Sequence, residues 1–331
     1  MSSALIIAIP SKGRLQENTA AFFARAGLNI KRNGGARNYR GRIVGVDGVD
    51  VAFLSASEIT KELAAGNVHL GVTGEDLVRE HVPEPEGRIE IITPLGFGHA
   101  DVVIAVPRAW IDVSSLSDLV DVAQLFHANH GRRLRVATKY ANLTGRFFAA
   151  HMLSDYRIVE SLGATEGAPA AGTADIIVDI TSTGSTLTAN DLKVPGGCTI
   201  LNSEASLVAS LVAEWTVTAR NALAQVLDHV AAEERARSIH ELRADWDAGM
   251  PAAAIDELIK DKDIVGVQRS GERLVLHIRR GDLHDVTAGL KAAGAARISV
   301  FAPSYVFEAC NPLFDRLNAA ITSAEKTRQD P

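Results

Sequence analysis

Cysteine is scarce in this chain, and its scarcity excludes several classes of protein. Only Cys198 and Cys310 occur among 331 residues. Two cysteines so far apart form neither a disulfide framework nor a paired-cysteine metal site, and they fit a reducing compartment. The histidines in the middle of the chain show no metal-ligand spacing either: His99, His127, His130 and His151. We therefore expect no metal centre held by protein side chains alone.

Long apolar runs are also missing, and we expect no signal peptide. The first apolar stretch covers residues 4–9, and no basic region precedes it, which is not the layout of a signal peptide. No stretch approaches the roughly 20 apolar residues that a membrane helix needs. We expect a cytoplasmic protein with no membrane partner.

Basic residues are in slight deficit. The chain has 34 Lys and Arg against 40 Asp and Glu, a formal net charge of -6. Nucleic acids favour a basic protein face, so we expect no nucleic-acid partner. A composition that is 47% hydrophobic and 22% charged is typical of a globular protein with sizeable cores. Any phosphate site must therefore be local and built from a few residues.

The chain does contain a regular alternation of strands and helices. Residues 5–9 form an apolar run typical of a strand covered on both faces, and residues 15–26 suit a helix. The alternation continues and predicts an α/β fold with a largely parallel sheet. A second α/β unit follows, and near residue 199 the chain returns to the first unit.

The predicted organisation is therefore one lobe inserted within another, with a hinged cleft between them where ligands are favoured. Residues 222–246 look like a long helix, and the pattern after them predicts a small α+β domain. The predicted parts are a first lobe of residues 1–97 with 196–221, a second lobe of residues 98–195 and a C-terminal domain of residues 222–331.

Residues 174–187 carry the most informative pattern. An apolar strand leads to Asp179 and then to a run of small donors: Thr181, Ser182, Thr183, Gly184, Ser185 and Thr186. Gly184 permits tight curvature, so that successive N–H groups and hydroxyls converge on a phosphate. Asp179 stands where a carboxylate holds ribose hydroxyls. The Walker pattern is absent, and an ordinary Ser/Thr/Gly turn is the alternative interpretation.

Two basic segments are further candidates for phosphate binding. Lys12 and Arg14 flank a glycine at the carboxyl end of the first strand, where open α/β sheets bind ligands, and both suit pyrophosphate or triphosphate oxygens. Residues 31–42 hold five cations, Arg37 and Arg40 among them. Both segments are equally typical of solvated turns and loops.

Two further strand ends are candidates. Residues 71–76 include Gly74 and join a strand to a helix, where Thr73 or Asp76 is alternatively just a helix cap. Residues 138–142 follow another strand and offer side chains to a base or a phosphate: Thr138, Tyr140 and Asn142.

Together these segments resemble a known family. Residues 166–187, from Glu166 through Gly172 and Asp175 to Leu187, resemble the signature of ATP phosphoribosyltransferases. Residues 11–15, 71–76 and 137–143 fall in the same order as in that family, and the similarity covers about residues 4–220.

The resemblance implies a two-lobed catalytic core similar to type II periplasmic binding proteins, followed by a small ferredoxin-like α+β domain. It implies a pentosyltransferase of histidine biosynthesis, in which N1 of ATP displaces pyrophosphate from C1′ of phosphoribosyl pyrophosphate (PRPP), with Mg²⁺ on the phosphates. This chemistry needs orientation and charge stabilisation rather than a covalent nucleophile.

The resemblance also implies residue roles. Asp179 and residues 181–186 would hold the ribose and 5′-phosphate of PRPP, and Lys12, Arg14 and Asp179 would form the catalytic set. The nucleotide side would draw on the remaining candidates: Arg37, Arg40, Gly74, Thr138, Tyr140, Asn142 and Glu166. Many members carry an arginine where this chain has Ser55, and we expect Arg37 or Arg40 to replace it.

The length of the chain is that of the family's long form, which carries a histidine-binding C-terminal domain. We therefore expect inhibition by histidine and a homo-oligomer, with a separate regulatory subunit as the alternative. The residues alone leave two other functions open: a small-molecule-binding module of the same fold, or another transferase that uses PRPP.

Overall fold

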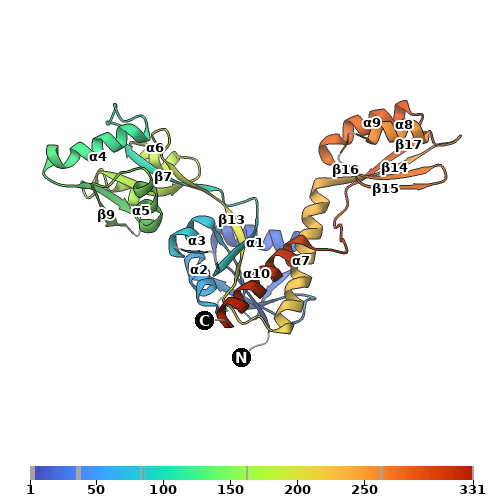
Figure 1. Cartoon of the computed structure of the whole chain (residues 1–331), viewed down its shortest axis with the longest axis horizontal. Coiled ribbons are helices and arrows are strands. Elements are labelled where there is room, and N and C mark those ends of the chain that lie inside the picture. The colour runs from blue at the N-terminus through green and yellow to red at the C-terminus, as the bar shows by residue number, and fades with distance from the viewer. Residues whose placement is uncertain are drawn as a thin grey trace.

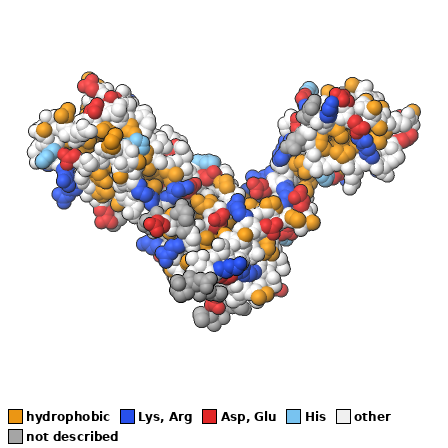
Figure 2. All heavy atoms as spheres, viewed as in Figure 1, with side chains coloured by type: hydrophobic (Ala, Val, Ile, Leu, Met, Phe, Trp, Pro, Cys, Tyr) orange, Lys and Arg blue, Asp and Glu red, His pale blue; other side chains and the backbone are white. Residues whose placement is uncertain are grey.

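The computed structural model describes residues 4–34, 39–82, 84–85, 87–161, 163–260, 262 and 264–329. The chain forms a V in Figure 1, with a central lobe at the vertex and one arm on each side. We call the central part, built on a seven-stranded sheet, lobe I, and the arm built on a six-stranded sheet lobe II. The other arm is the C-terminal sheet domain, built on four strands. Figure 2 shows charged side chains of both signs mixed over all three parts of the face in view.

Lobe I has the strand order β2-β3-β4-β1-β5-β13-β6. Its strands are β1 (Leu5–Pro10), β2 (Ile30–Arg32), β3 (Arg40–Ile43), β4 (Val49–Leu54), β5 (Leu70–Gly74), β6 (Ile89–Pro94) and β13 (Ala205–Ser210), and its helices are α1 (Gly13–Arg25), α2 (Ala56–Ala65) and α3 (Glu75–His81). Strand β1 pairs in parallel with β4 and β5. Ile7 packs in one core cluster and Ala8 in another, so β1 is covered on both faces, as its continuous apolar run predicts.

Two helices from the end of the chain complete the core of lobe I. Helix α7 (Val217–Ser238) contributes Leu223 and Val226 to it, and helix α10 (Pro312–Gln329) contributes Leu317 and Ile321. The two helices are joined where Arg220 of α7 donates to Glu325 of α10 at 2.7 Å. Figure 1 shows α10 lying across lobe I, far from the arm that precedes it in sequence.

Lobe II has the strand order β11-β7-β10-β8-β9, with β12 also paired to β7. Its strands are β7 (Ala100–Pro107), β8 (Leu134–Thr138), β9 (Tyr156–Glu160), β10 (Ile176–Thr181), β11 (Leu192–Lys193) and β12 (Thr199–Ser203), and its helices are α4 (Leu116–His130), α5 (Ala141–Ala150), η1 (Thr165–Gly167) and α6 (Ser185–Ala189). Strand β10 runs parallel to β8. The chain enters lobe II after β6 and leaves it between β12 and β13, so two crossovers join the lobes.

The C-terminal sheet domain has the strand order β15-β16-β14-β17. It comprises β14 (Ile239–Asp245), α8 (Ala252–Ile259), β15 (Ile264–Ser270), β16 (Arg273–Arg279), η2 (Arg280–Asp282), α9 (Leu283–Ala292) and β17 (Arg297–Phe301). The element order βαββαβ, with the first strand between the third and the last, is that of the ferredoxin-like fold. Its core includes Ile255 of α8 and Leu290 of α9. The predicted fold class, a two-lobed α/β core with a ferredoxin-like domain, is confirmed.

The long helix predicted over residues 222–246 is wrong for its last part, residues 239–246. Helix α7 ends at Ser238, and residues from Ile239 onward form strand β14. Ile239, Leu242 and Ala244 are buried in this strand between more exposed neighbours. The segment was predicted as helix because Ala, Glu and Arg have high helix propensity, which tertiary packing overrides here. The predicted domain boundaries stay predictions, and α7 runs across the last of them.

Among the described residues, no helix is both long enough and apolar enough to span a bilayer. Both cysteines are free; Cys198 is buried and Cys310 is exposed.

Candidate functional site

A small cavity lies where the carboxyl ends of strands from the two lobes come together. In lobe I, β1 and β5 pair in parallel and end at Pro10 and Gly74. Their carboxyl ends therefore lie at the same edge of the sheet. In lobe II, the parallel strands β8 and β10 end at Thr138 and Thr181. A cavity of about 330 Å³ lies between these edges, lined from lobe I by Leu15, Gly74 and Asp76 and from lobe II by Lys139, Tyr140 and Ile180.

The loop after Asp179 is open and rich in donors. Thr181 accepts a hydrogen bond from the Gly184 N–H at 3.0 Å, which closes the turn, and Gly184 has a φ of 71°, in the left-handed region that favours glycine. The hydroxyls of Thr183 and Ser185 lie 2.9 Å apart. The side chains of Ser182, Thr183, Ser185 and Thr186 are exposed. The loop can therefore present hydroxyls to an anion, as its sequence predicts.

Asp179 directly precedes Ile180, a cavity residue, and is paired with Lys139, a second cavity residue at the neighbouring strand end. The Lys139 ammonium lies 3.7 Å from Asp179 Oδ1, and the same oxygen accepts the Ile180 N–H at 2.8 Å. The Asp179 side chain is 16% exposed and that of Lys139 is 42% exposed. Sequence analysis missed Lys139, although it stands between Thr138 and Tyr140, which were both selected.

Asp76 joins the two lobes under the cavity. Its Oδ2 accepts the hydroxyl of Tyr140 at 2.8 Å, and its Oδ1 accepts the hydroxyl of Ser203 at 2.9 Å. Burial of the Tyr140 ring and, to a smaller extent, the nearby charge of Asp76 raise the pKa of Tyr140. The phenol therefore stays protonated and donates its hydrogen bond to Asp76. A Cβ on Gly74 would lie 2.2 Å from Asp76 Oδ1. Sequence analysis considered Asp76 only as a helix cap.

Thr138 and Asn142 make contacts within the protein rather than lining the cavity. The buried Thr138 hydroxyl accepts the Tyr140 N–H at 2.8 Å and so stabilises the turn. The Asn142 side chain donates to the Glu80 carbonyl of lobe I at 2.9 Å. Glu166 lies half-buried in the turn η1, and η1 contacts β10.

The predicted cations lie along the same edge of lobe I. The side chains of Lys12 and Arg14 are exposed at the start of α1, three residues and one residue before Leu15, which lines the cavity. Arg40 is exposed at the start of β3, which lies antiparallel to β4 and therefore begins near the carboxyl edge of the sheet. Arg37 lies outside the described residues.

The place of the family arginine is taken by a helix cap. Ser55 accepts the Glu58 N–H, and Glu58 in turn accepts the Ser55 N–H at 2.8 Å, a complete capping box for α2. A nearby cation that sequence analysis did not select is Arg32. Its guanidinium lies 3.8 Å from the centre of the Phe53 ring and donates to the Ser11 carbonyl at 3.1 Å.

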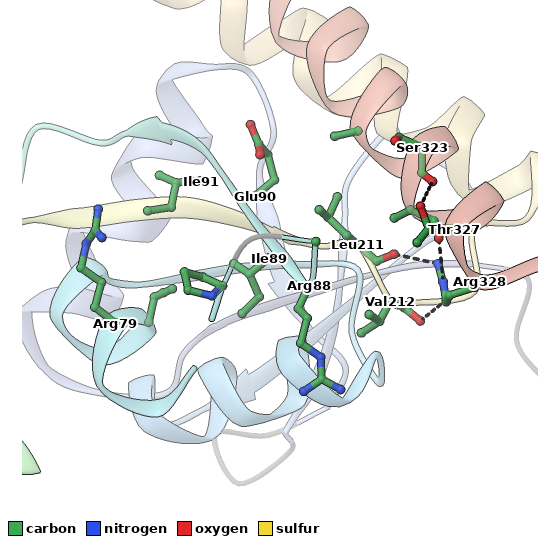
Figure 3. A pocket seen from close by; sticks show the side chains of 15 residues that line it. Arg79, Arg88, Ile89, Glu90, Ile91, Leu211, Val212, Ser323, Thr327 and Arg328 are labelled. Carbon is green, nitrogen blue, oxygen red and sulfur yellow. Dashed lines mark hydrogen bonds between the residues drawn. The ribbon is translucent and has the colours of Figure 1, made fainter. Parts of the chain in front are cut away.

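A larger cavity, of about 810 Å³, lies elsewhere on lobe I between β6, α3 and α10. Figure 3 shows its arginines: Arg79 and Arg88 point in different directions, and Arg328 donates to the carbonyls of Leu211 and Val212. The cavity contains none of the predicted site residues. Because its charged groups do not converge, we place the functional site at the smaller cavity between the lobes. Among the described residues, no group of three or more His, Cys, Asp or Glu side chains is placed to hold a metal ion.

Comparison with known proteins gives one consistent result. The family model described as ATP phosphoribosyltransferase (HisG) matches residues 55–232, more than half of the chain. A curated ATP phosphoribosyltransferase of Bradyrhizobium sp. (strain ORS 278) is 53% identical over 326 residues, 98% of this chain and 100% of that protein. One of Rhodopseudomonas palustris (strain BisA53) is 52% identical over the same shares.

Among solved structures, a chain of the ATP phosphoribosyltransferase (HisG:HisZ) complex from Thermotoga maritima is similar to this chain. The TM-score is 0.52 at 23% identity, and the match covers 69% of this chain and 96% of that one. At this identity the likeness supports the fold.

Proposed function

Because the chain belongs to the ATP phosphoribosyltransferase family, we propose that the cavity between its lobes is where PRPP and ATP meet. The enzyme transfers the 5-phosphoribosyl group of PRPP to N1 of ATP and releases pyrophosphate, the first step of histidine biosynthesis. Both substrates are polyanions. The site must therefore bind several phosphates and hold C1′ of one substrate against N1 of the other.

We assign PRPP to the loop after Asp179. The exposed hydroxyls of Thr183, Ser185 and Thr186 and the left-handed turn at Gly184 suit a sugar phosphate, which accepts several hydrogen bonds from hydroxyls and N–H groups. This open set of donors, next to the Asp179 carboxylate that pairs with the cavity residue Lys139, is the observation that carries the assignment. Asp179 would bind the ribose hydroxyls, and its charge would favour the positive charge that develops at C1′.

The leaving group is the second electrostatic task. Pyrophosphate gains negative charge as the C1′ bond breaks, so cations placed on its side lower the barrier. We propose Lys12 and Arg14 for this role, because both are exposed immediately before Leu15, a cavity residue. Lys139 is the cation that lies closest to Asp179, and we propose that it changes partner from Asp179 to a substrate phosphate when PRPP binds.

ATP would then occupy the side of the cavity formed by Gly74 and Tyr140. Thr138 and Asn142 would act through Tyr140 and helix α5, since their polar groups are already bonded within the protein. Arg40, exposed at the start of β3, would meet the triphosphate from the edge of lobe I, and Arg37 and Glu166 remain candidates for the nucleotide.

For Mg²⁺ we propose that substrate phosphates supply most of the ligands. Mg²⁺ keeps several waters in proteins and is bound through one or two carboxylates together with phosphates. Asp179 is the carboxylate that the loop places beside the proposed PRPP phosphates. The ion would neutralise part of the pyrophosphate charge there.

The PRPP assignment is tested by Thr186→Ala. The loss of one hydrogen bond to a charged phosphate is worth about 1.5–3 kcal/mol, so the KM for PRPP should rise about tenfold or more. Steady-state rates of N1-(5-phosphoribosyl)-ATP formation, followed by ultraviolet absorbance, give the KM. Thr188→Ala is the matched control, because Thr188 is also exposed but lies one half-turn beyond the loop. Wild-type kinetics in folded Thr186→Ala would remove the loop from the site.

For regulation we propose that histidine binds to the C-terminal sheet domain and inhibits the enzyme. A polar cavity of about 500 Å³ on its sheet is lined by Glu241, Arg243, Arg273 and His277, among others. Side chains of both signs suit an amino acid, which carries an ammonium and a carboxylate. We further propose a homo-oligomer in the cytoplasm. A second subunit, which the Thermotoga complex contains in HisZ, is the alternative that the mass in solution would reveal.

A further inference from the structure

Helix α3 of lobe I presents two buried carboxylates to lobe II. Asp76 and Glu80 are four residues apart and therefore lie on the same face of the helix; their side chains are among the most buried charged groups described, at 5% and 4% exposure. Figure 1 shows α3 and α5 at the junction of the lobes. Asp76 holds Tyr140, as described above, and Glu80 holds the start of α5.

The start of α5 receives its cap from the other lobe. No side chain of its own caps this helix, and the first N–H groups of a helix have no partner within it. Glu80 fills this role: its Oε1 accepts the Asn142 N–H at 3.0 Å, and its Oε2 accepts the Leu143 N–H at 2.9 Å. The Asn142 side chain also donates back to the Glu80 carbonyl.

This arrangement depends on a charged side chain. A buried carboxylate is costly unless its oxygens are hydrogen-bonded, and here both oxygens accept an N–H at the positive end of a helix dipole. Conversely, the two N–H groups of α5 lose their partners if Glu80 is removed, since the helix offers no substitute. Glu80 and the start of α5 therefore stabilise each other.

The residues just before this cap are the lobe II residues of the site. Lys139 and Tyr140 directly precede α5 and line the cavity, and Lys139 also pairs with Asp179. We propose that Glu80 is a positioning residue: from lobe I it fixes the start of α5, and through it sets where Lys139 and Tyr140 lie relative to the substrates. This inference rests on the cavity being the substrate site, as proposed above.

The variant Glu80→Gln tests the proposal. Glutamine keeps the size of the side chain, but its single oxygen can accept from only one of the two N–H groups. Its NH2 group would then face the second N–H, donor against donor. We expect kcat/KM to fall about tenfold or more for both substrates, the effect of losing a charge-assisted hydrogen bond. Glu80→Asp retains both acceptor oxygens at a shorter reach, and we expect it to recover part of the lost kcat/KM.

A matched control is available in Glu233→Gln. Glu233 is another buried glutamate, 5% exposed, and it pairs with Arg25 and Arg237 at 3.3 and 3.2 Å. Its substitution removes buried charge from α7, at a distance from α5 in sequence and outside the proposed site. We expect Glu233→Gln to lower the midpoint of thermal unfolding while kcat/KM at 25 °C stays at the wild-type value.

Hydrogen exchange supplies a measurement that does not depend on activity. In the substrate-free protein, the amides of residues 139–143 should exchange faster in Glu80→Gln than in the wild type, and should be unchanged in Glu233→Gln. A wild-type enzyme that forms no product would contradict the proposed function, while exchange would still decide the role of Glu80. Unchanged exchange in Glu80→Gln, or the same kinetics as Glu233→Gln, would overturn the positioning role.

Discussion

Gly74 lies so close to the Asp76 carboxylate that a Cβ atom at this position would collide with it. The structure places an added Cβ 2.2 Å from Asp76 Oδ1, the oxygen that accepts from Ser203, and the other oxygen of the same carboxylate accepts from Tyr140. The backbone itself tolerates a side chain, because Gly74 has an ordinary φ of -75°. A substitution here therefore moves the carboxylate without straining the chain.

Gly74→Ala should accordingly reduce activity while the fold persists. Displacement of Asp76 breaks or lengthens two hydrogen bonds to a charged group, each worth about 1.5–3 kcal/mol, so we expect the KM for ATP to rise about tenfold. Steady-state kinetics with varied ATP measures the effect. Gly281→Ala is the control, since the space around Gly281 is open, and its kinetics should match the wild type. An unchanged KM in Gly74→Ala would place the nucleotide away from Tyr140.

At the scale of elements, the fold could be predicted where a strand or helix is decided by its own residues. Strand β1 and the loop at Thr181–Thr186 follow from an apolar run and from a cluster of small donors. Strand β14 could not be predicted in this way, because its sequence favours a helix and only pairing with β16 and β17 makes it a strand. The strands in the basic segment likewise depend on pairing, β3 with β4 and β2 with β3.

The packing of helix α10 likewise could not be predicted from the sequence. Its sequence follows the C-terminal sheet domain, yet Leu317 and Ile321 are fully buried in the core of lobe I. A partner so distant in sequence leaves no local signal. The catalytic lobe is therefore closed by the last helix of the chain, and removing everything after residue 222 would take away part of the lobe's core along with the C-terminal sheet.

Leu317→Ala should destabilise lobe I although it lies far from the cleft in sequence. Truncation of a fully buried leucine costs about 2–5 kcal/mol of the free energy of unfolding. Chemical denaturation, followed by the fluorescence of Trp215 in the same core cluster, measures the loss. Lys326→Ala on the exposed side of α10 should change the stability by less than about 0.5 kcal/mol. Equal stability of the two variants would show that α10 does not close this core.

At the scale of the whole molecule, the candidate site is made by contacts between lobes. Sequence analysis could select the loops, because each carries its donors or cations locally. It could not select Glu80 or Lys139, because their roles depend on which strand ends face each other: Glu80 and Asn142 are 62 residues apart. Arg32 could not be selected either, because its hydrogen bond to the Ser11 carbonyl depends on where β2 pairs with β3. That Arg37 or Arg40 replaces the family arginine stays a prediction.

The C-terminal sheet domain is tied to the catalytic lobe at two places. Helix α7 leads into it from lobe I, and the returning chain runs back beside α7, where the Val306 N–H donates to the Ala232 carbonyl at 3.0 Å. The Tyr305 hydroxyl donates to the Arg25 carbonyl at the end of α1. Helix α1 begins directly after Lys12, so the segment that returns from the sheet domain contacts the helix whose other end carries the proposed pyrophosphate site.

The proposed inhibition by histidine provides a test of this connection. Arg243 lines the polar cavity on the sheet and, in our proposal, binds the carboxylate of histidine. Arg243→Ala removes that contact, worth about 1.5–3 kcal/mol, so the histidine concentration for half-inhibition should rise about tenfold or more. Because Arg243 is remote from the cleft, kcat and both KM values without histidine should stay at wild-type values. Initial rates over a histidine titration provide both results.

Arg269→Ala is the matched control for this prediction. Arg269 lies on the same sheet, but its guanidinium pairs with Asp256 of α8 and is not among the residues of the polar cavity. Its removal should leave inhibition unchanged. If Arg243→Ala is inhibited as strongly as the wild type, the effector binds elsewhere. If histidine does not inhibit the wild-type enzyme at all, the sheet domain has a role other than feedback.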